Sequence, residues 1–284
     1  MIEPSDLLVL GGLTIDRFPD GRQAAGGSVL HAARALAVAG LRGAVITVAG
    51  SEPQAFAALV ELRRLGPTEV QAAPRSIRFA IDDTVAPRRL TFDGGTRLHV
   101  SAAAVRAHPS RAVLLAPIAG ELDSAAFTAT AGVAVRVAAL QGWLRNLAPG
   151  RAVEARTLAS LDEELSTALR AVDALVASDE DLAAVAPDPG EALTAMRRWA
   201  GPRPILVVTV GEAGALLDEP RHGRLSLPAS DVVHLVPTVG AGDRFAALFA
   251  AKLGRGADAV DALHDAARGV SRWLAARSGG SEAG

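Results

Sequence analysis

The sequence has no cysteine and only one lysine, Lys252, among its 29 basic residues. Without cysteine the chain can form no disulfide bond, offers no thiolate nucleophile and supplies no sulfur ligand to zinc or to an iron–sulfur cluster. Lys252 does not follow a glycine-rich stretch in the GxxxxGK[ST] spacing. A phosphate-binding loop of that kind is therefore excluded.

Other common signatures are also missing. No GxGxxG follows a strand pattern, which argues against a nicotinamide-dependent dehydrogenase, and no GxSxG supports a hydrolase. The six histidines do not have the HExxH spacing of a zinc site. The net charge is −2, so the sequence lacks the basic character expected of a protein that binds nucleic acid or an anionic membrane.

Long apolar runs are absent too. No charge-free stretch reaches the roughly 18 residues of a membrane-spanning helix, and the opening MIEPSDLLVLGG lacks the basic start and cleavage site of a signal peptide. We therefore expect a cytoplasmic protein with neither a membrane nor a nucleic-acid partner. Half of the residues are hydrophobic and 21% are charged, which is typical of a globular chain with a sizeable core.

Short apolar runs alternate with helical patterns along most of the chain. The runs have the length of strands and are apolar on both faces, which is typical of parallel strands covered by helices. This order predicts an α/β fold with a doubly wound, mostly parallel sheet. The predicted strands are residues 7–10, 44–48, 112–116, 133–140, 174–177 and 205–210, and the helices between them are residues 28–39, 54–65, 162–170 and 191–199.

Two segments interrupt this alternation. Residues 13–25 are polar and too short for a crossover, and residues 76–100 read as three short antiparallel strands, SIRFAIDD, RRLTFD and TRLHV. Asp93-Gly94-Gly95 is expected to form the turn between the last two. Such a patch is either an edge hairpin or a small antiparallel β lid over the main sheet.

The last third has a different pattern. Two short strands are expected at residues 216–217 and 224–227, and a long helical tract begins at Gly240. There Thr238-Val239-Gly240-Ala241-Gly242-Asp243 opens an apolar helix. The glycines let backbone N–H groups approach an anion, and an aspartate beside that anion can accept a proton from an attacking hydroxyl. Glycine and aspartate are equally ordinary residues at a helix start, and this second interpretation stays open here.

A similar start is found near the N-terminus. Gly26-Gly27-Ser28 opens a helix, and Asp16 lies ten residues earlier. Asp16 can hydrogen-bond ligand hydroxyls, while the glycines let a substrate lie against backbone. The alternative is a loop aspartate with a simple helix cap. His31, inside this helix, is by default a packed residue.

Two segments follow predicted strands at the end where doubly wound folds bind nucleotides. Thr209-Val210-Gly211-Glu212-Ala213-Gly214 follows one strand, and read alone it is a hairpin turn. Ser178-Asp179-Glu180-Asp181 follows another, where its carboxylates either hold a magnesium–water shell or cap the next helix.

Taken together, these segments resemble the ribokinase-like (PfkB) family of carbohydrate and nucleoside kinases over essentially the whole chain. TVGAGDRFAALFAAKL is similar to the family's D-T-x-G-A-G-D signature, and LVLGGLTIDRF with AAGGSVLHAARALAVAGL resembles its substrate-binding opening. VVTVGEAGALL is similar to its nucleotide-side strand and turn, while LLAPIAGEL and ALQGWLR look more like a branch that includes inositol and nucleoside kinases.

The resemblance implies one kinase domain over residues 1–284, with lid segments 13–25 and 76–100. It implies transfer of the γ-phosphoryl group of ATP, with Mg²⁺, to a hydroxyl of a sugar, polyol or nucleoside. By this resemblance Asp243 is the catalytic base and Gly240, Ala241 and Gly242 form the anion hole; Asp16, Gly26, Gly27 and His31 bind substrate; Thr209, Gly211, Gly214 and Thr238 bind ATP; and Ser178 and Asp181 reach magnesium through water.

Departures from the family pattern keep a second function open. Pro237 stands where the signature has an acid, His31 where many sugar kinases have asparagine, and Ser178 and Asp181 replace the Asn and Glu of N-x-x-E. These changes suggest a catalytically impaired ligand-binding protein on a kinase fold, whereas the retained GAGD favours an enzyme. With no P-loop lysine, backbone dipoles, magnesium and arginine must meet the phosphoryl charge. Arg244 and nearby arginines are candidates, and the sequence does not rank them.

The lid suggests one further partner. Its strands carry Ile77, Phe79 and Ile81 on one side, and three strands are too few to bury that side alone. We expect it to pack on bound substrate and on the lid of a second copy, which would give a homodimer.

Overall fold

The structure is a computed structural model that describes residues 3–82, 84–85, 89–229 and 238–279. Its main element is a nine-stranded sheet in the order β16-β15-β14-β13-β9-β8-β1-β4-β5. Strands β5 to β14 in that order are parallel, and the β14–β15 and β15–β16 pairs are antiparallel. The strands are β1 (Ser5–Gly12), β4 (Gly43–Ala49), β5 (Thr68–Ala72), β8 (Ser110–Leu115), β9 (Val135–Ala139), β13 (Ala174–Ser178), β14 (Ile205–Thr209), β15 (Ala215–Glu219) and β16 (Gly223–Leu227).

This topology confirms the predicted doubly wound α/β fold. From β1 the chain adds β4 and β5 on one side, then returns to add β8, β9, β13 and β14 on the other. The order of winding therefore reverses at β1, and ligands bind beyond the carboxyl ends of the strands at such a point.

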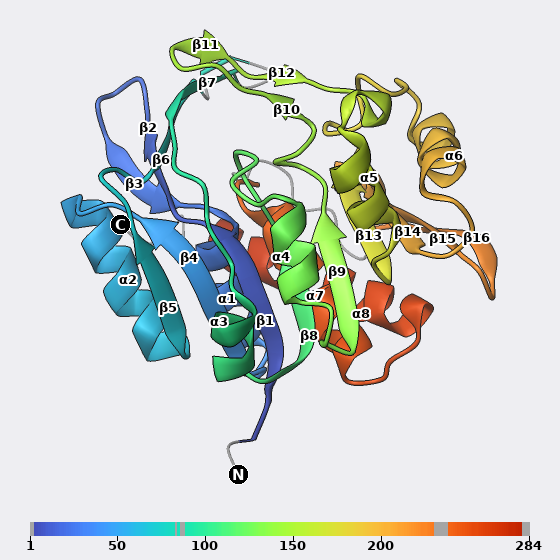
Figure 1. Ribbon diagram of the computed structural model, residues 1–284. Coiled ribbons are helices and arrows are strands. Elements are labelled where there is room, and N and C mark those ends of the chain that lie inside the picture. The colour runs from blue at the N-terminus through green and yellow to red at the C-terminus, as the bar shows by residue number, and fades with distance from the viewer. Residues whose placement is uncertain (1–2, 83, 86–88, 230–237, 280–284) are drawn as a thin grey trace.

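Helices cover both faces of the sheet, as the doubly apolar strands require. Leu7 and Val9 of β1 pack with residues of α1, α2, α7 and α8, while Leu8 and Leu10 pack with residues of α4, α5 and α6. Figure 1 shows α4 and α5 on the near face and α7 and α8 on the far face. The helices are α1 (Ser28–Val38), α2 (Pro53–Leu65), α3 (Ala102–Ala107), α4 (Ser124–Ala129), α5 (Glu163–Arg170), α6 (Pro189–Ala200), α7 (Ala241–Gly254) and α8 (Ala259–Gly279), with short 3₁₀ turns η1 (Leu158–Ser160) and η2 (Gly211–Ala213).

A second, five-stranded sheet lies beyond the tips of β4 and β9 in Figure 1. Both interrupting segments contribute strands to it, so the small separate sheet is confirmed, and its role as a lid stays a prediction. Strand β2 pairs in parallel with β6, and the other pairings are antiparallel. Its order is β11 (Arg151–Ala152), β7 (Arg89–Gly94), β6 (Ile77–Asp82), β2 (Thr14–Arg17) and β3 (Gln23–Gly26); β10 (Arg145–Asn146) and β12 (Glu154–Ala155) form a separate pair.

The third strand expected in residues 76–100 was wrong. Residues 95–100 form no strand, and Asp93 and Gly94 are the last residues of β7 rather than a hairpin turn. The reason is that Leu98 is buried and its N–H donates to the carbonyl oxygen of Glu121, which draws this segment away from the lid to the main body. The place beside β7 is taken by β11, from a distant part of the chain.

The apolar side of the lid is covered by the chain itself. Ile77, Phe79 and Ile81 are each at most 5% exposed and pack in the same cluster as Ile118 and Trp143. The expectation that this side needs substrate or a partner's lid to cover it was therefore wrong, because segments beyond residues 76–100 complete the core. Dimerisation itself stays a prediction. No helix among the described residues is long and apolar enough to cross a membrane.

Candidate functional site

The sequence-predicted site residues gather at the carboxyl edge of the main sheet. Strand β1 ends at Gly12, β13 at Ser178 and β14 at Thr209. Helix α7 runs the opposite way, because a Cβ on Gly254, its last residue, would lie 2.7 Å from the Cβ of Ala112 near the start of β8. Its first turn, which carries Gly240–Asp243, therefore points toward the same edge.

Gly240 joins this first turn to α1. Its φ is +85°, and a Cβ there would lie only 2.4 Å from Nδ1 of His31. Glycine is required for both reasons, since other residues are strained at this φ and no methyl group fits against the ring. The anion-binding turn and the substrate-binding helix predicted from separate motifs are thus in direct contact.

His31 is neutral in this environment. Burial, followed by the charges of Arg244, Arg34 and Arg277, lowers its pKa to about 4. Its Nδ1 is buried and has no hydrogen-bond partner among the residues that the structure describes. The interpretation of His31 as a packed residue is therefore correct for the side of the ring that carries Nδ1. Its predicted role in substrate binding stays a prediction.

The other predicted substrate residues lie close by. In the β2–β3 pairing Thr14 lies opposite Gly26, and a Cβ on Gly26 would lie 2.6 Å from Oδ2 of the buried Asp16. Gly27 has a φ of +98°, and a Cβ on it would lie 2.3 Å from the carbonyl oxygen of Gly12. The start of α1 therefore touches both the end of β1 and the Asp16 carboxylate.

Glu121 is a residue of this edge to which the sequence reasoning gave no role. Its buried carboxylate accepts hydrogen bonds from the backbone N–H of Gly12 (2.6 Å), Ile118 (3.0 Å) and Ala119 (2.8 Å). Burial raises its pKa, against the opposing effect of these donors. Glu121 thereby ties the end of β1 to the loop after β8. A lone acid in the apolar stretch LLAPIAGEL was the available signal.

Most of the predicted ATP and magnesium residues lie at the carboxyl ends of β13 and β14 or just after them. Ser178 pairs with Thr209 in the β13–β14 register. Gly211 and Gly214 lie in the turn that leads to the antiparallel β15, so the hairpin-turn interpretation is correct and their nucleotide role stays a prediction. Thr238 is exposed, and its carbonyl accepts from the N–H of Ala241. Pro237 lies outside the described residues.

The Ser178–Asp181 segment is a closed turn. The Asp181 carboxylate accepts from the Ser178 N–H at 3.0 Å, and the Asp181 N–H donates to Ser178 Oγ at 3.1 Å. No group of three or more His, Asp or Glu side chains within the described ranges is placed to hold a metal ion. The predicted contact of Ser178 and Asp181 with magnesium through water stays a prediction.

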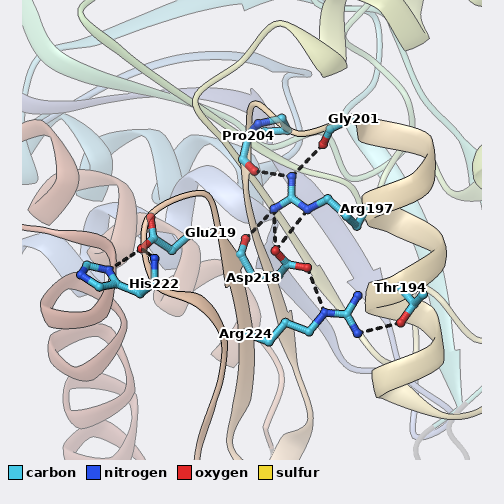
Figure 2. A network of polar contacts seen from close by, with 8 residues as sticks. All are labelled: Thr194, Arg197, Gly201, Pro204, Asp218, Glu219, His222 and Arg224. Atoms are coloured by element: carbon cyan, nitrogen blue, oxygen red, sulfur yellow. Dashed lines mark hydrogen bonds and ion pairs between the residues drawn. The ribbon is translucent and has the colours of Figure 1, made fainter.

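A polar network lies near the amino end of β14, where Asp218 pairs opposite Leu206. Asp218 of β15 accepts from Arg197 of α6 at 3.0 Å and from Arg224 of β16 at 3.0 Å, and Arg197 also donates to the carbonyls of Gly201 and Pro204 (Figure 2). The β14–β16 strands are thereby anchored to α6.

Two cavities are lined by none of the predicted site residues. One, of about 600 Å³, lies between the loops after β8 and β9 and the start of α5. It is lined by both arginines and carboxylates, some of them paired with one another, such as Arg97 with Asp123. The other, of about 300 Å³, lies at the amino ends of β13 and β14, away from the predicted site. The candidate site therefore rests on the convergence of strand ends and helix starts rather than on either cavity.

Comparison with solved structures gives the same fold. A pyrophosphate-dependent kinase of the ribokinase family, complexed with a pyrophosphate analog and myo-inositol, has a TM-score of 0.72 at 17% identity over 92% of both chains. Ribokinase of Arabidopsis thaliana, complexed with ribose and ATP, has a TM-score of 0.71 at 16% identity over 93% of this chain and 91% of that one. Ribokinase of Thermotoga maritima has a TM-score of 0.67 at 16% identity over 90% and 89%.

Sequence comparison identifies the family. No curated protein sequence matches the chain significantly. The family model described as pfkB family carbohydrate kinase matches residues 121–282, which is more than half of the chain and includes the GAGD turn. The resemblance noted in the sequence is therefore confirmed, and this chain belongs to the pfkB family of carbohydrate kinases.

Proposed function

We propose that this protein is a small-molecule kinase that transfers the γ-phosphoryl group of ATP to a hydroxyl of a sugar, polyol or nucleoside. The observation that carries the proposal is the contact between Gly240 and His31. It places the turn that can bind a phosphoryl group against the helix whose start adjoins Asp16. Donor and acceptor sites on these two elements would then share one edge of the sheet.

The residues of this edge can perform the transfer. Asp16 and the backbone at Gly26 and Gly27 hold the acceptor hydroxyl, and the first turn of α7 points its N–H groups and its positive dipole at the phosphoryl group. As the hydroxyl oxygen bonds to phosphorus and the bond to the leaving phosphate breaks, Asp243 takes the hydroxyl proton. The lid strands over this edge limit the access of water, which would compete as acceptor.

In this proposal, magnesium and ATP bind at the carboxyl ends of β13 and β14. The Ser178–Asp181 turn and Thr209 lie side by side at the ends of β13 and β14, where Thr209, Gly211 and Gly214 would face the nucleotide. When bound, Mg²⁺ neutralises charge on the phosphate chain. Asp181 would reach it through a water, with the Ser178 N–H holding the carboxylate in place.

The experiment that tests this function is Asp243→Asn. Asparagine keeps the size and the hydrogen bonding of the side chain but cannot take the proton, so kcat should fall by about 10²–10⁴ while ATP affinity and melting temperature stay near wild type. The matched control is Asp261→Asn, which changes an exposed aspartate in the first turn of α8 and should leave kcat unchanged. Acceptors are drawn from a panel of polyols, sugars and nucleosides, with ATP and pyrophosphate as donors.

The outcomes separate the candidate functions. Near-normal kcat in folded Asp243→Asn would make Asp243 a helix-start residue only. Wild-type protein that binds an acceptor but transfers phosphate to none of the panel would favour the alternative of an impaired ligand-binding protein. Turnover with pyrophosphate and none with ATP would replace the proposed donor.

A further inference from the structure

Arg244 carries a buried positive charge beside the GAGD turn. Its side chain is 6% exposed, and it follows Asp243 in the first turn of α7. It forms no ion pair or side-chain hydrogen bond with any described residue, and its Nε is fully buried without a partner. Arginine is almost never buried in this way unless it is paired, because removing a charge from water is costly.

The groups around Arg244 offset its charge only in part. Its guanidinium lies over the ring of Trp273, 4.2 Å from the ring centre, and Arg277 approaches the same ring at 5.2 Å. Arg34, on α1, is already paired with Glu61 through two hydrogen bonds of 2.6 and 2.7 Å. Burial, followed by the charges of Arg34 and Arg277, lowers the pKa of Arg244 to about 10, and the charge of Asp243 opposes this shift only in part. It remains protonated near neutral pH.

Arg244 lies within the same helical turn as the predicted anion-binding residues. Its backbone N–H donates to the carbonyl of Gly240 at 3.1 Å, so the two residues lie one turn apart on the same side of α7. Long side chains in helices lean toward the N-terminus, which directs the guanidinium back toward Gly240 and His31. No side chain of a described residue caps the start of α7. The charge of Arg244 acts on His31, the residue against which Gly240 packs.

We propose that Arg244 is a positioning residue that supplies positive charge behind the first turn of α7, and that the missing anion is the polyphosphate chain of the phosphoryl donor. The inference rests on the proposed function for the identity of the donor. It explains why a charge that costs stability is kept beside the GAGD turn. It also supplies a cation in a chain whose single lysine lies elsewhere on this helix.

The test measures binding and stability together. Inorganic pyrophosphate and Mg-ATP are each titrated calorimetrically, without acceptor, into wild type, Arg244→Met, Arg244→Gln, Arg244→Lys and Arg277→Met. Each protein is also melted without ligand. Arg277→Met is the matched control, since it removes an exposed arginine from the same tryptophan ring.

We expect Arg244→Met and Arg244→Gln to bind both polyphosphates about tenfold more weakly or worse, because a buried charge acts strongly on a multivalent anion. Arg244→Lys should stay near wild type, and Arg277→Met within about twofold because exposed charges are screened. Without ligand, the neutral variants should melt at or above the wild-type temperature, since an unpaired buried charge is removed.

Two results would overturn the proposal. A lower melting temperature with unchanged polyphosphate affinity in either neutral variant would make Arg244 a structural partner of Trp273 only. Weaker binding of Mg-ATP alone would place it near the nucleoside instead of the phosphates. These binding measurements need no turnover, so they test the role of Arg244 separately from the proposed kinase activity. A wild type that is inactive but binds pyrophosphate through Arg244 would refute the kinase activity and support the role of Arg244.

Discussion

The contact between Gly240 and His31 leads to a quantitative prediction for Gly240→Ala. The backbone at Gly240 has a φ of +85°, where a residue with a Cβ costs about 1–2 kcal/mol more than glycine. The new methyl carbon would lie 2.4, 2.5 and 2.6 Å from three atoms of the imidazole ring. These are far inside van der Waals contact, so the ring or the helix must move, at a further cost of about 1–3 kcal/mol.

The free energy of unfolding should therefore fall by about 2–5 kcal/mol in Gly240→Ala. Urea unfolding measures this quantity directly. His31→Ala separates the two contributions, because removing the ring abolishes the overlap but leaves the backbone strain. In the His31→Ala background, Gly240→Ala should cost only about 1–2 kcal/mol.

Activity adds an independent measurement. Movement of the α7 start would displace its N–H groups from the phosphoryl group, and misplacement by about 1 Å can lower kcat by about 10². An equal cost of Gly240→Ala in both backgrounds would refute the contact. A cost near zero would refute the left-handed backbone as well.

Other predictions concern the surrounding residues. His31 should lower the free energy of unfolding of the wild type by about 3 kcal/mol from pH 6.5 to 4, because the unfolded chain binds a proton on His31 that the folded chain resists until about pH 4. In urea titrations at these pH values, His31→Asn should lack this loss of about 3 kcal/mol. Glu121→Gln turns an amide group toward backbone N–H donors and should cost about 2–4 kcal/mol. It should also raise the KM for the acceptor, because Gly12 leads into the strand of Asp16. Asp218→Asn should lower the unfolding free energy by about 2–3 kcal/mol, against less than about 0.5 for exposed Glu163→Gln.

The main sheet was predictable from sequence because a buried parallel strand has a signal within itself. Runs such as residues 205–210 are apolar on both faces, and glycines and aspartates mark the helix boundaries between them. The lid was less predictable, since its strands are short and are completed by distant segments. Nothing in TRLHV indicates that Leu98 turns inward, or that residues 151–152 replace it beside β7.

The candidate site was also predictable from the sequence only in part. Motifs placed Asp16, Gly26 and Gly240 at strand ends and helix starts, and topology alone brings those ends to one edge. The contacts between them depend on how α1 and α7 pack, so the fit of Gly240 on the His31 ring has no counterpart in either motif. Glu121 was overlooked because a single carboxylate in an apolar segment has no spacing pattern to mark it.

Arg244 shows where sequence and structure have to be read together. In the sequence it is one of several arginines that could meet the phosphoryl charge, and nothing there ranks it above the others. Its charge becomes significant only once its burial, the Trp273 ring and the pairing of Arg34 with Glu61 are known. Burial without a partner is unfavourable for folding, and such costs are tolerated where a bound anion can offset them. The stability of the ligand-free protein and its affinity for polyphosphate should therefore change in opposite directions when this charge is removed.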